Sequence, residues 1–261
     1  MPKRALSVPL ILASILGLVI VATIAYYIWG PSRPSIRDVW VINLEKAKDR
    51  WTHIQSTYKG TLPLHRWDAT YGKTTLRAAA NADGVDILWS RPCSREEGKQ
   101  SDYVVKNAGE IGCWLSHKRL LRHLSHQAAS AEEGHLICED DLEFHETWYE
   151  EWKQLAPTIP TDWDMVYFGI HKPNGDRLNG RILKARVKED THGNWGTHAY
   201  LVRHGSIPKI LDTLRNMSNP IDVQYNFNFD RLNAYIIDPS LLRLNSTLSA
   251  NSAIQEASPK K

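Results

Sequence analysis

The chain has 261 residues, of which 42% are hydrophobic and 23% are charged, and its formal net charge is +3. This is the composition of a globular protein, so it excludes a disordered chain. The small net charge gives no reason to expect a nucleic-acid partner.

The first predicted element is an apolar span at residues 8–29, which carries no charged side chain. A bilayer core of about 30 Å needs roughly 20 apolar residues in a helix, so this span is long enough to cross it. Aromatic residues, which favour the membrane interface, stand at its end. A cleaved signal peptide would have a shorter apolar region followed by small residues. We therefore expect a retained transmembrane signal-anchor, preceded by a short tail at 1–7 and followed by a stem at 30–35.

Two sequons and three cysteines bear on where the protein lies. The Asn-X-Ser/Thr triplets begin at Asn216 and Asn245 and agree with a lumenal or extracellular domain. Cys93, Cys113 and Cys138 are too few for a disulfide framework and leave open one bridge plus one buried thiol. We expect a single-pass protein, type II in the Golgi or endoplasmic reticulum with a lumenal domain, or an inner-membrane protein if the source is bacterial. Basic residues flank the span on both sides, so charge alone does not give its orientation.

The folded part is predicted to be one domain over 36–248, followed by a polar tail at 249–261. Short apolar runs alternate with stretches of helical period, and the segment 69–107 shows no period. Strands are expected at 39–44, 135–139, 163–168, 197–202 and 234–238, and helices at 45–58, 109–129 and 207–215. This alternation predicts an α/β domain with a mostly parallel sheet and helices on both faces. In such sheets, ligands bind beyond the carboxyl ends of the strands.

One predicted strand ends in three consecutive acidic residues, Glu139, Asp140 and Asp141. Adjacent carboxylates repel one another unless a positive charge lies among them, and hard cations such as Mg²⁺ and Mn²⁺ take carboxylate oxygens. A cation there could neutralise charge that develops on a diphosphate leaving group. The alternative is a solvated acidic turn or the N-terminus of a helix.

Five pieces of sequence, spread over about residues 38–240, occur in the order of one enzyme family. They are 41–44 with 49–50 and 66–72, 109–117 with 136–142, 163–169, 196–202, and 220–222. In these pieces the chain resembles glycosyltransferase family 25. That family includes bacterial lipooligosaccharide galactosyltransferases and the collagen hydroxylysine galactosyltransferases.

The resemblance implies a GT-A type nucleotide-diphospho-sugar transferase fold and a metal-dependent, inverting transfer of a hexose to an acceptor hydroxyl. UDP-galactose is the expected donor, and Mn²⁺ or another divalent cation is the expected metal, with Glu139 and Asp141 as its ligands. The resemblance places seven further residues at the nucleotide-sugar site: Asn43, Leu44, Arg50, Ala69, Ser116, His117 and Asp140. The guanidinium of Arg50 has the geometry to reach phosphate, but an exposed salt bridge on its helix is an equal alternative. Ser116 and His117 have the alternative of packing between elements.

An inverting transferase needs a base that takes the proton of the acceptor hydroxyl, and an Asp or Glu within hydrogen-bond reach is the usual solution. Asp222, in the last matching piece, is our candidate, with Glu143 and Asp164 as rivals. No metal-ligand spacing joins His192, His198 and His204, although His198 lies in a matching strand where it could approach the metal.

The expected partners are a nucleotide sugar, a glycan, lipid-linked or protein acceptor, and a membrane. Two other functions stay open. The fold could serve as a non-catalytic carbohydrate-binding or adhesion module, or the chain could be an anchored hydrolase with paired carboxylates. The intact acidic triplet favours the transferase. Residues 78–106 match nothing in the family pattern, so the acceptor is not predicted.

Overall fold

The computed structural model describes residues 16–17, 20–21, 33–72, 86–87, 108–186, 193–217 and 219–249. The chain divides into two compact units, Met1–Arg33 and Pro34–Lys261. The predicted anchor at 8–29 lies outside the described residues except for four of them. Within the described part of the chain, no helix has the length and apolar character needed to cross a membrane.

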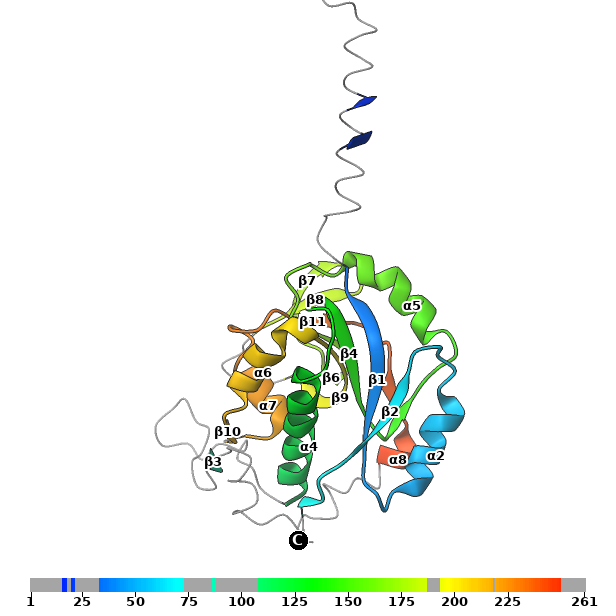
Figure 1. The fold of residues 1–261 in the computed structure, drawn as a ribbon, viewed down its shortest axis with the longest axis vertical. Helices are drawn as coiled ribbons and strands as arrows, with labels where there is room; N and C mark the ends of the chain where they lie inside the picture. The colour runs from blue at the N-terminus through cyan, green and yellow to red at the C-terminus, as the bar shows by residue number, and fades with distance from the viewer. Residues whose placement is uncertain are drawn as a thin grey trace, which may run out of the picture. The chain divides into compact units, whose positions relative to one another are not determined.

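The second unit is built on one eight-stranded sheet with the order β2-β1-β4-β9-β6-β11-β8-β7 (Figure 1). Its strands are β1 (Ser35–Asn43), β2 (Leu64–Asp68), β4 (Glu133–Glu139), β6 (Met165–His171), β7 (Gly175–Asn179), β8 (Ile182–Ala185), β9 (Trp195–Arg203) and β11 (Ala234–Ile237). β1 runs parallel to β2 and β4, and β6 runs parallel to β11, whereas β9 and β8 are antiparallel to both of their neighbours. Six of the eight strands therefore point the same way, which confirms the predicted mostly parallel sheet in a mixed form.

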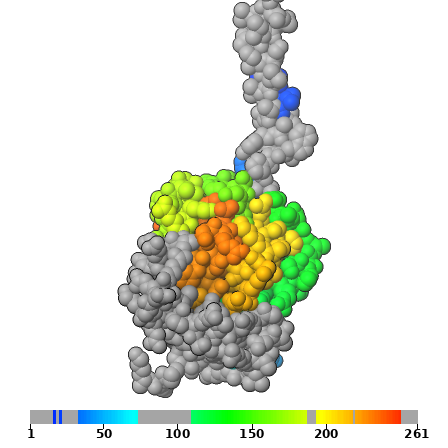
Figure 2. Space-filling model, turned by 90° about the vertical axis from the view of Figure 1, so that its left-hand side faces the viewer, coloured from blue at the N-terminus to red at the C-terminus, as the bar shows by residue number. Residues whose placement is uncertain are grey.

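Helices cover both faces of the sheet, as predicted. Figure 1 shows α4 (Ala108–Ser125), α6 (Ile207–Thr213) and α7 (Ile221–Asn226) on one face, and α2 (Lys48–Thr57) and α5 (Trp148–Leu155) on the other. The chain around α6 and α7 reaches the surface in yellow and orange in Figure 2. The other described elements are the short helices η2 (Ala156–Thr158), η3 (His204–Ser206) and α8 (Ser246–Ser249), and the paired strands β3 (Asp86–Ile87) with β10 (Asn216–Met217) and β5 (Leu142–Glu143) with β12 (Arg243–Leu244).

Two apolar cores result, one on each face, because alternate residues of a strand point to opposite faces. In β4, Ile137 belongs to the core beneath α4, α6 and α7, whereas Leu136 and Cys138 belong to the core beneath α2 and α5. The apolar stripe predicted for α4 is buried throughout: Ile111, Trp114, Leu115, Leu121 and Leu124 are each at most 2% exposed. Burial of that stripe fixes α4 against the sheet.

Several elements were not predicted, among them the helices α5 and α7. The residues of β2 were part of a family motif but were not predicted to form a strand. Neither the β7–β8 hairpin nor the β5–β12 ribbon was predicted. Of the segment expected to be irregular, 69–107, the structure describes 69–72 and the two residues of β3. Residues 30–32 of the predicted stem and residues 250–261 of the predicted tail lie outside the described residues.

Candidate functional site

The predicted site residues gather where β1 and β4 end. The register of these parallel strands pairs Ile42 with Glu139, so Asn43 and Asp140 follow side by side. β9 runs the other way beside β4, so its first residues, including Thr197 and His198, lie at the same edge. This is the carboxyl edge at which ligands bind in open α/β sheets.

Asp140 ties this edge together. Its carboxylate accepts a 2.7 Å hydrogen bond from the side-chain amide of Asn43 and a 2.7 Å charged hydrogen bond from Arg50. Arg50 also donates to the carbonyl oxygen of Leu248 over 2.7 Å. Burial raises the pKa of the Asp140 carboxyl, and the bonds from Arg50 and Asn43 oppose that rise. The alternative of an exposed salt bridge for Arg50 is wrong, because its side chain is only 14% exposed.

Glu139 points the opposite way, toward α4. Its Oε1 accepts a 2.7 Å hydrogen bond from the hydroxyl of Thr197 and lies 3.5 Å from Nε2 of His117. The other ring nitrogen of His117 lies 2.8 Å from the hydroxyl of Tyr200, which fixes the ring. Burial favours the protonated form of Glu139, yet the hydrogen bond and charge of His117 and the Thr197 hydroxyl hold its pKa below the ordinary value.

Asp141 is the acid of the triplet that forms no ion pair with a described residue. Its side chain is buried, and Oδ1 has no hydrogen-bond partner among the described residues. Burial, followed by the negative charges of Glu139 and Asp140, raises the pKa of Asp141 to about 7. A buried, unsatisfied carboxylate oxygen is costly. Because the neighbouring Glu139 is ionised, this oxygen of Asp141 is suited to bind a cation.

Asp222 lies at the start of α7 and binds the first residues of β9 through hydrogen bonds. Its Oδ2 accepts a 2.7 Å hydrogen bond from the backbone N–H of Gly196, and Oδ1 accepts one of 2.8 Å from Val223. Burial raises the pKa of Asp222, and these two N–H groups oppose the rise. Asn226 donates to the carbonyl oxygens of Asn194 and Asp222, which fastens the segment before β9 to α7.

Three other predicted residues line the edge without exposing reactive groups to it. Ser116 is buried, donates to the carbonyl oxygen of Gly112 over 2.6 Å and accepts from the N–H of Thr70 over 2.8 Å. Ala69 donates its N–H to the carbonyl oxygen of Asn43 over 3.0 Å, and half-buried Leu44 begins the turn that leads to α2. These residues shape the edge of the candidate site. Ser116 packs between elements, which was the alternative given for it in the sequence analysis.

The sequence reasoning missed Cys113. It lies one helical turn before His117 on α4, and its sulfur, a ring nitrogen of His117 and a carboxylate oxygen of Glu139 all lie within 4.8 Å of one another. Burial, and then the charges of Glu139 and Asp222, raise the pKa of the Cys113 thiol well above its ordinary value. The four-residue spacing on a predicted helix was the signal that could have found this group. Cys113 and Cys138 are both free thiols, and Cys93 lies outside the described residues.

Several candidates lie elsewhere. Asp164, a rival base, stands at the opposite edge before β6, where Ser206 and Lys209 bind its carboxylate. His204 contacts His135 at that same edge, and His192 is outside the described residues. His198 lies at the candidate site, where burial lowers its pKa to about 4. Glu143 is exposed on β5, two residues beyond Asp141.

The donor atoms at this edge suit a hard divalent cation. Asp140 is paired with Arg50, so Glu139 and Asp141 are the two carboxylates that a cation could bind, and their oxygens are ligands of the kind that Mg²⁺ and Mn²⁺ prefer. The neighbouring thiol and imidazole of Cys113 and His117 are softer ligands of the kind that suit zinc. The residues present therefore fit a metal bound by Glu139, together with either Asp141 or this softer pair.

Comparison with known proteins agrees with this geometry. A family model described as glycosyltransferase family 25 (LPS biosynthesis protein) matches residues 36–225. The chain is also similar to procollagen galactosyltransferase 1-B of Xenopus laevis, with 24% identity over 233 residues that cover 81% of this chain and 36% of the relative. The chain thus spans about a third of the length of that curated relative. Because the family model covers most of the folded unit and the acidic triplet lies within the match, the chain belongs to glycosyltransferase family 25.

Proposed function

We propose that this protein is a metal-dependent, inverting hexosyltransferase that moves galactose from UDP-galactose to an acceptor hydroxyl. The observation that carries the proposal is the buried acidic turn, in which Asp141 has an unsatisfied oxygen beside ionised Glu139. Membership of family 25 supports glycosyl transfer from a nucleotide sugar. The name of the Xenopus relative, a procollagen galactosyltransferase, supports galactose as the sugar.

Glu139 and Asp141 would hold the cation, which when bound neutralises charge on the departing diphosphate. Asn43 and Arg50 fix the turn that carries these acids through their bonds to Asp140. A turn fixed before the substrate binds does not have to reorganise as charge develops, and such preorganisation is a large part of enzymatic rate enhancement.

Asp222 is the proposed base. As the acceptor oxygen forms its bond to the anomeric carbon, the bond from that carbon to the diphosphate oxygen breaks and UDP leaves with the electron pair. The acceptor proton passes to a carboxylate oxygen of Asp222. Burial favours this transfer, because it raises the pKa of Asp222 above the ordinary range of aspartate. The bonds from Gly196 and Val223 hold the carboxylate in one orientation.

Anchoring by residues 8–29 is part of the proposal and rests on the apolar composition of that span. A tether would keep the enzyme in a compartment through which acceptors pass, either a secretory lumen or the space beyond a bacterial inner membrane. Extraction of membranes with alkaline carbonate tests the anchor. The protein should stay in the pellet, and a chain that lacks 8–29 should be released.

A panel of sugar nucleotides tests the transfer. The purified protein is incubated with each donor, with Mn²⁺ or with a chelator, beside an Asp141→Ala variant. We expect turnover of one donor that requires the metal and is lost in the variant. If no donor turns over and no nucleotide binds in the presence of Mn²⁺, the proposal fails in favour of a non-catalytic carbohydrate-binding module.

A further inference from the structure

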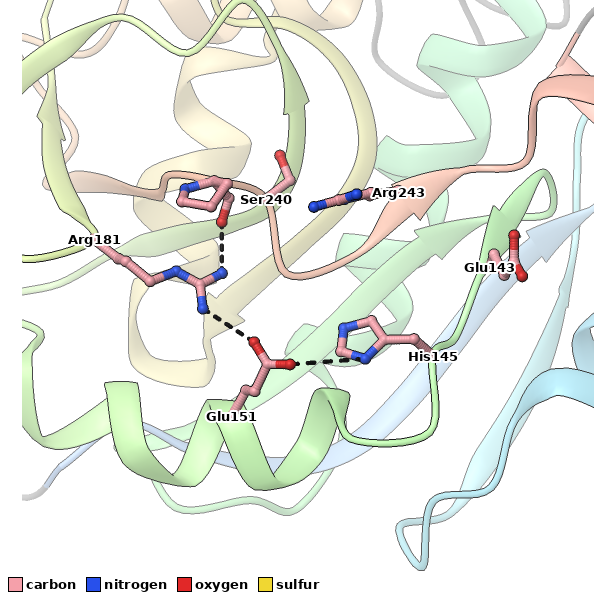
Figure 3. A pocket seen from close by; sticks show the side chains of 7 residues that line it. Glu143, His145, Glu151, Arg181, Ser240 and Arg243 are labelled. Atoms are coloured by element: carbon pink, nitrogen blue, oxygen red, sulfur yellow. Dashed lines mark hydrogen bonds and ion pairs between the residues drawn. The ribbon is translucent and has the colours of Figure 1, made fainter.

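A pocket of about 450 Å³ lies apart from the acidic turn and has no role in the function proposed above. It is bounded by the β5–β12 ribbon, helix α5, the turn between β7 and β8, and the segment that follows β11 (Figure 3). Its lining is unusually polar for a ligand pocket, since the side chains that face it include two arginines, a histidine and two glutamates. The charges of these side chains determine which charged ligands the pocket can bind.

Arg181 offers the pocket hydrogen-bond donors. One terminal nitrogen of its guanidinium donates to Glu151 over 3.0 Å, and the other donates to the carbonyl oxygen of Pro239 over 2.7 Å. Its Nε is buried and has no hydrogen-bond partner within the described part of the chain. A buried N–H without an acceptor costs free energy. This atom is closed to solvent, so a ligand in the pocket would instead accept from the terminal nitrogens, each of which has a second N–H beside the one bound to Glu151 or Pro239.

Arg243 offers an unpaired charge. It is exposed on β12, and its side chain makes no hydrogen bond or ion pair with any residue that the structure describes. Figure 3 shows its guanidinium extended toward Ser240 and Arg181, whereas its cross-strand neighbour Glu143 lies on the far side of it. Two guanidinium groups therefore face the same space from two different elements.

The other charges of the lining are largely compensated. Glu151 is paired with Arg181, and its second oxygen accepts from the hydroxyl of Thr147 over 3.1 Å and lies 3.8 Å from Nδ1 of His145. The opposite ring nitrogen of His145 donates to the carbonyl oxygen of Leu241 over 2.8 Å. The lining as a whole carries two arginines and two glutamates. Figure 3 draws Glu143 beyond Arg243, so the space between the two guanidinium groups is the part of the pocket that suits an anion.

The β5–β12 ribbon connects the pocket to the acidic turn. In this ribbon Leu142 pairs with Leu244, and both pack into the core beneath α5. Side chains alternate along a strand, so Arg243 and Glu143 lie on the opposite face. The N–H of Asn245 donates to the carbonyl oxygen of Asp141 over 2.8 Å, which continues the pairing to the acidic turn. Glu143, which lines the pocket, follows Asp141 by two residues along the chain.

We propose that this pocket binds an acidic sugar through its carboxylate or phosphate group, which accepts hydrogen bonds from Arg181 and Arg243. The guanidinium fork matches both kinds of anion. Because the ribbon leads from the pocket to Asp141, the bound sugar is placed as part of the acceptor. The acceptor assignment and the choice of a sugar rest on the proposed transferase function, whereas binding of an anion by the two guanidinium groups does not.

Binding is tested first, on the full chain without donor or metal. Calorimetric titration with glucuronic acid, glucose 6-phosphate and glucose separates the carboxylate, the phosphate and the neutral ring. We expect at least one acid to bind and glucose not to bind. Arg243→Gln should weaken the acid by about tenfold, as expected when one charge-assisted hydrogen bond is lost, and Glu143→Gln should strengthen it. The matched control Arg231→Gln removes an exposed arginine that is paired with Asp212 and should change nothing.

Equal binding of glucose, or equal affinities in the Arg243→Gln variant and the wild type, would overturn the site. The acceptor assignment has its own measurement. In transfer assays Arg243→Gln should raise the KM for an acidic acceptor about tenfold and leave the donor KM unchanged. A raised donor KM would instead show that the anion bound here is the nucleotide diphosphate. A protein with no transferase activity would refute the proposed function but still give a clear answer in the binding titration.

Discussion

The guanidinium of Arg50 lies 2.7 Å from Oδ1 of Asp140, and this ion pair joins α2 to the turn after β4. Both side chains are largely buried, at 14% and 12% exposed. The middle acid of the triplet is thus neutralised by the protein itself, while Glu139 and Asp141 are left for a cation. We therefore propose two different roles for the three adjacent acids, a structural one for Asp140 and a cation-binding one for Glu139 and Asp141.

Removing Asp140 should cost stability. Asp140→Ala leaves Arg50 buried without its partner, and the loss of one member of a buried pair typically costs about 3 kcal/mol or more. Urea unfolding in the presence of a chelator measures the effect. Glu150→Ala is the control, because it removes an exposed pair with Lys153 on α5 and should change the unfolding free energy by less than about 1 kcal/mol. Equal losses in the two variants would show that the buried pair does not hold the edge together.

Without metal, stability should fall as the pH rises from about 4 to about 7. The pKa of Asp141 is about 7 in the folded chain and about 3.9 in an unfolded one. In that window the folded state binds more protons, so raising the pH favours unfolding. The melting temperature in chelator, compared between wild type and Asp141→Asn at pH 5 and pH 8, isolates this group. The wild type should lose more stability than the variant, and Mn²⁺ should restore it at pH 8. An equal change in the two proteins would contradict the raised pKa.

The cation should depend on oxygen ligands and not on the thiol. Asp141→Asn should weaken Mn²⁺ binding by at least about tenfold, whereas Cys113→Ser should change it by less than about threefold, because Mn²⁺ prefers carboxylate oxygens to sulfur. Electron paramagnetic resonance of free Mn²⁺ measures both affinities. The reverse order would place the cation among Cys113, His117 and Glu139.

Much of the fold could be predicted from local pattern. The stripe of α4 and the apolar runs of β1, β4, β6 and β11 bury large side chains, so their period is visible in the sequence. The direction of β9 was not predictable, because the local pattern of a strand does not show how it runs relative to its neighbours in the sheet. The β7–β8 hairpin left one signal, the dipeptide Asn179-Gly180 at its turn, which is typical of tight hairpins.

The rule for carboxyl edges predicted the site residues that stand at strand ends, whereas those on helices were predicted only through the family resemblance. Asn43, Glu139 and Asp141 follow from the rule for carboxyl edges. The contacts of Glu139 could not be predicted from this rule, because the hydroxyl of Thr197 and the ring of His117 reach its carboxylate from β9 and α4. Contacts across so many residues depend on the order of strands in the sheet, which one sequence does not contain.

Asp222 is tested by a substitution that keeps its shape. Asp222→Asn should lower the rate of transfer by at least about a hundredfold, the usual contribution of a general base, and should leave nucleotide binding within about threefold of the wild type. Asp212→Asn, an exposed aspartate on α6, serves as the matched control and should keep full activity. Retained transfer in Asp222→Asn would remove this residue as the base.

The turn before Thr197 should tolerate no side chain. Gly196 has φ of +89°, and a Cβ on it would lie 2.9 Å from Nδ1 of His198. Gly196→Ala should therefore destabilise the protein by about 1–2 kcal/mol for the backbone alone, with a further cost from the contact. Gly180→Ala, at a positive φ that faces open space, separates the two terms in thermal unfolding. A smaller loss at Gly196 than at Gly180 would show that the turn is not constrained.

The central claim is that Asp141 holds the cation that donor turnover requires. Its most direct test is the rate of UDP-galactose turnover by the wild type and by Asp141→Asn, each with Mn²⁺ and with chelator. We predict turnover only in the wild type with Mn²⁺, and folded but inactive protein in the other three samples. Equal turnover by the wild type with Mn²⁺ and with chelator, or full activity of Asp141→Asn, would contradict the assignment of this acidic turn as the metal site.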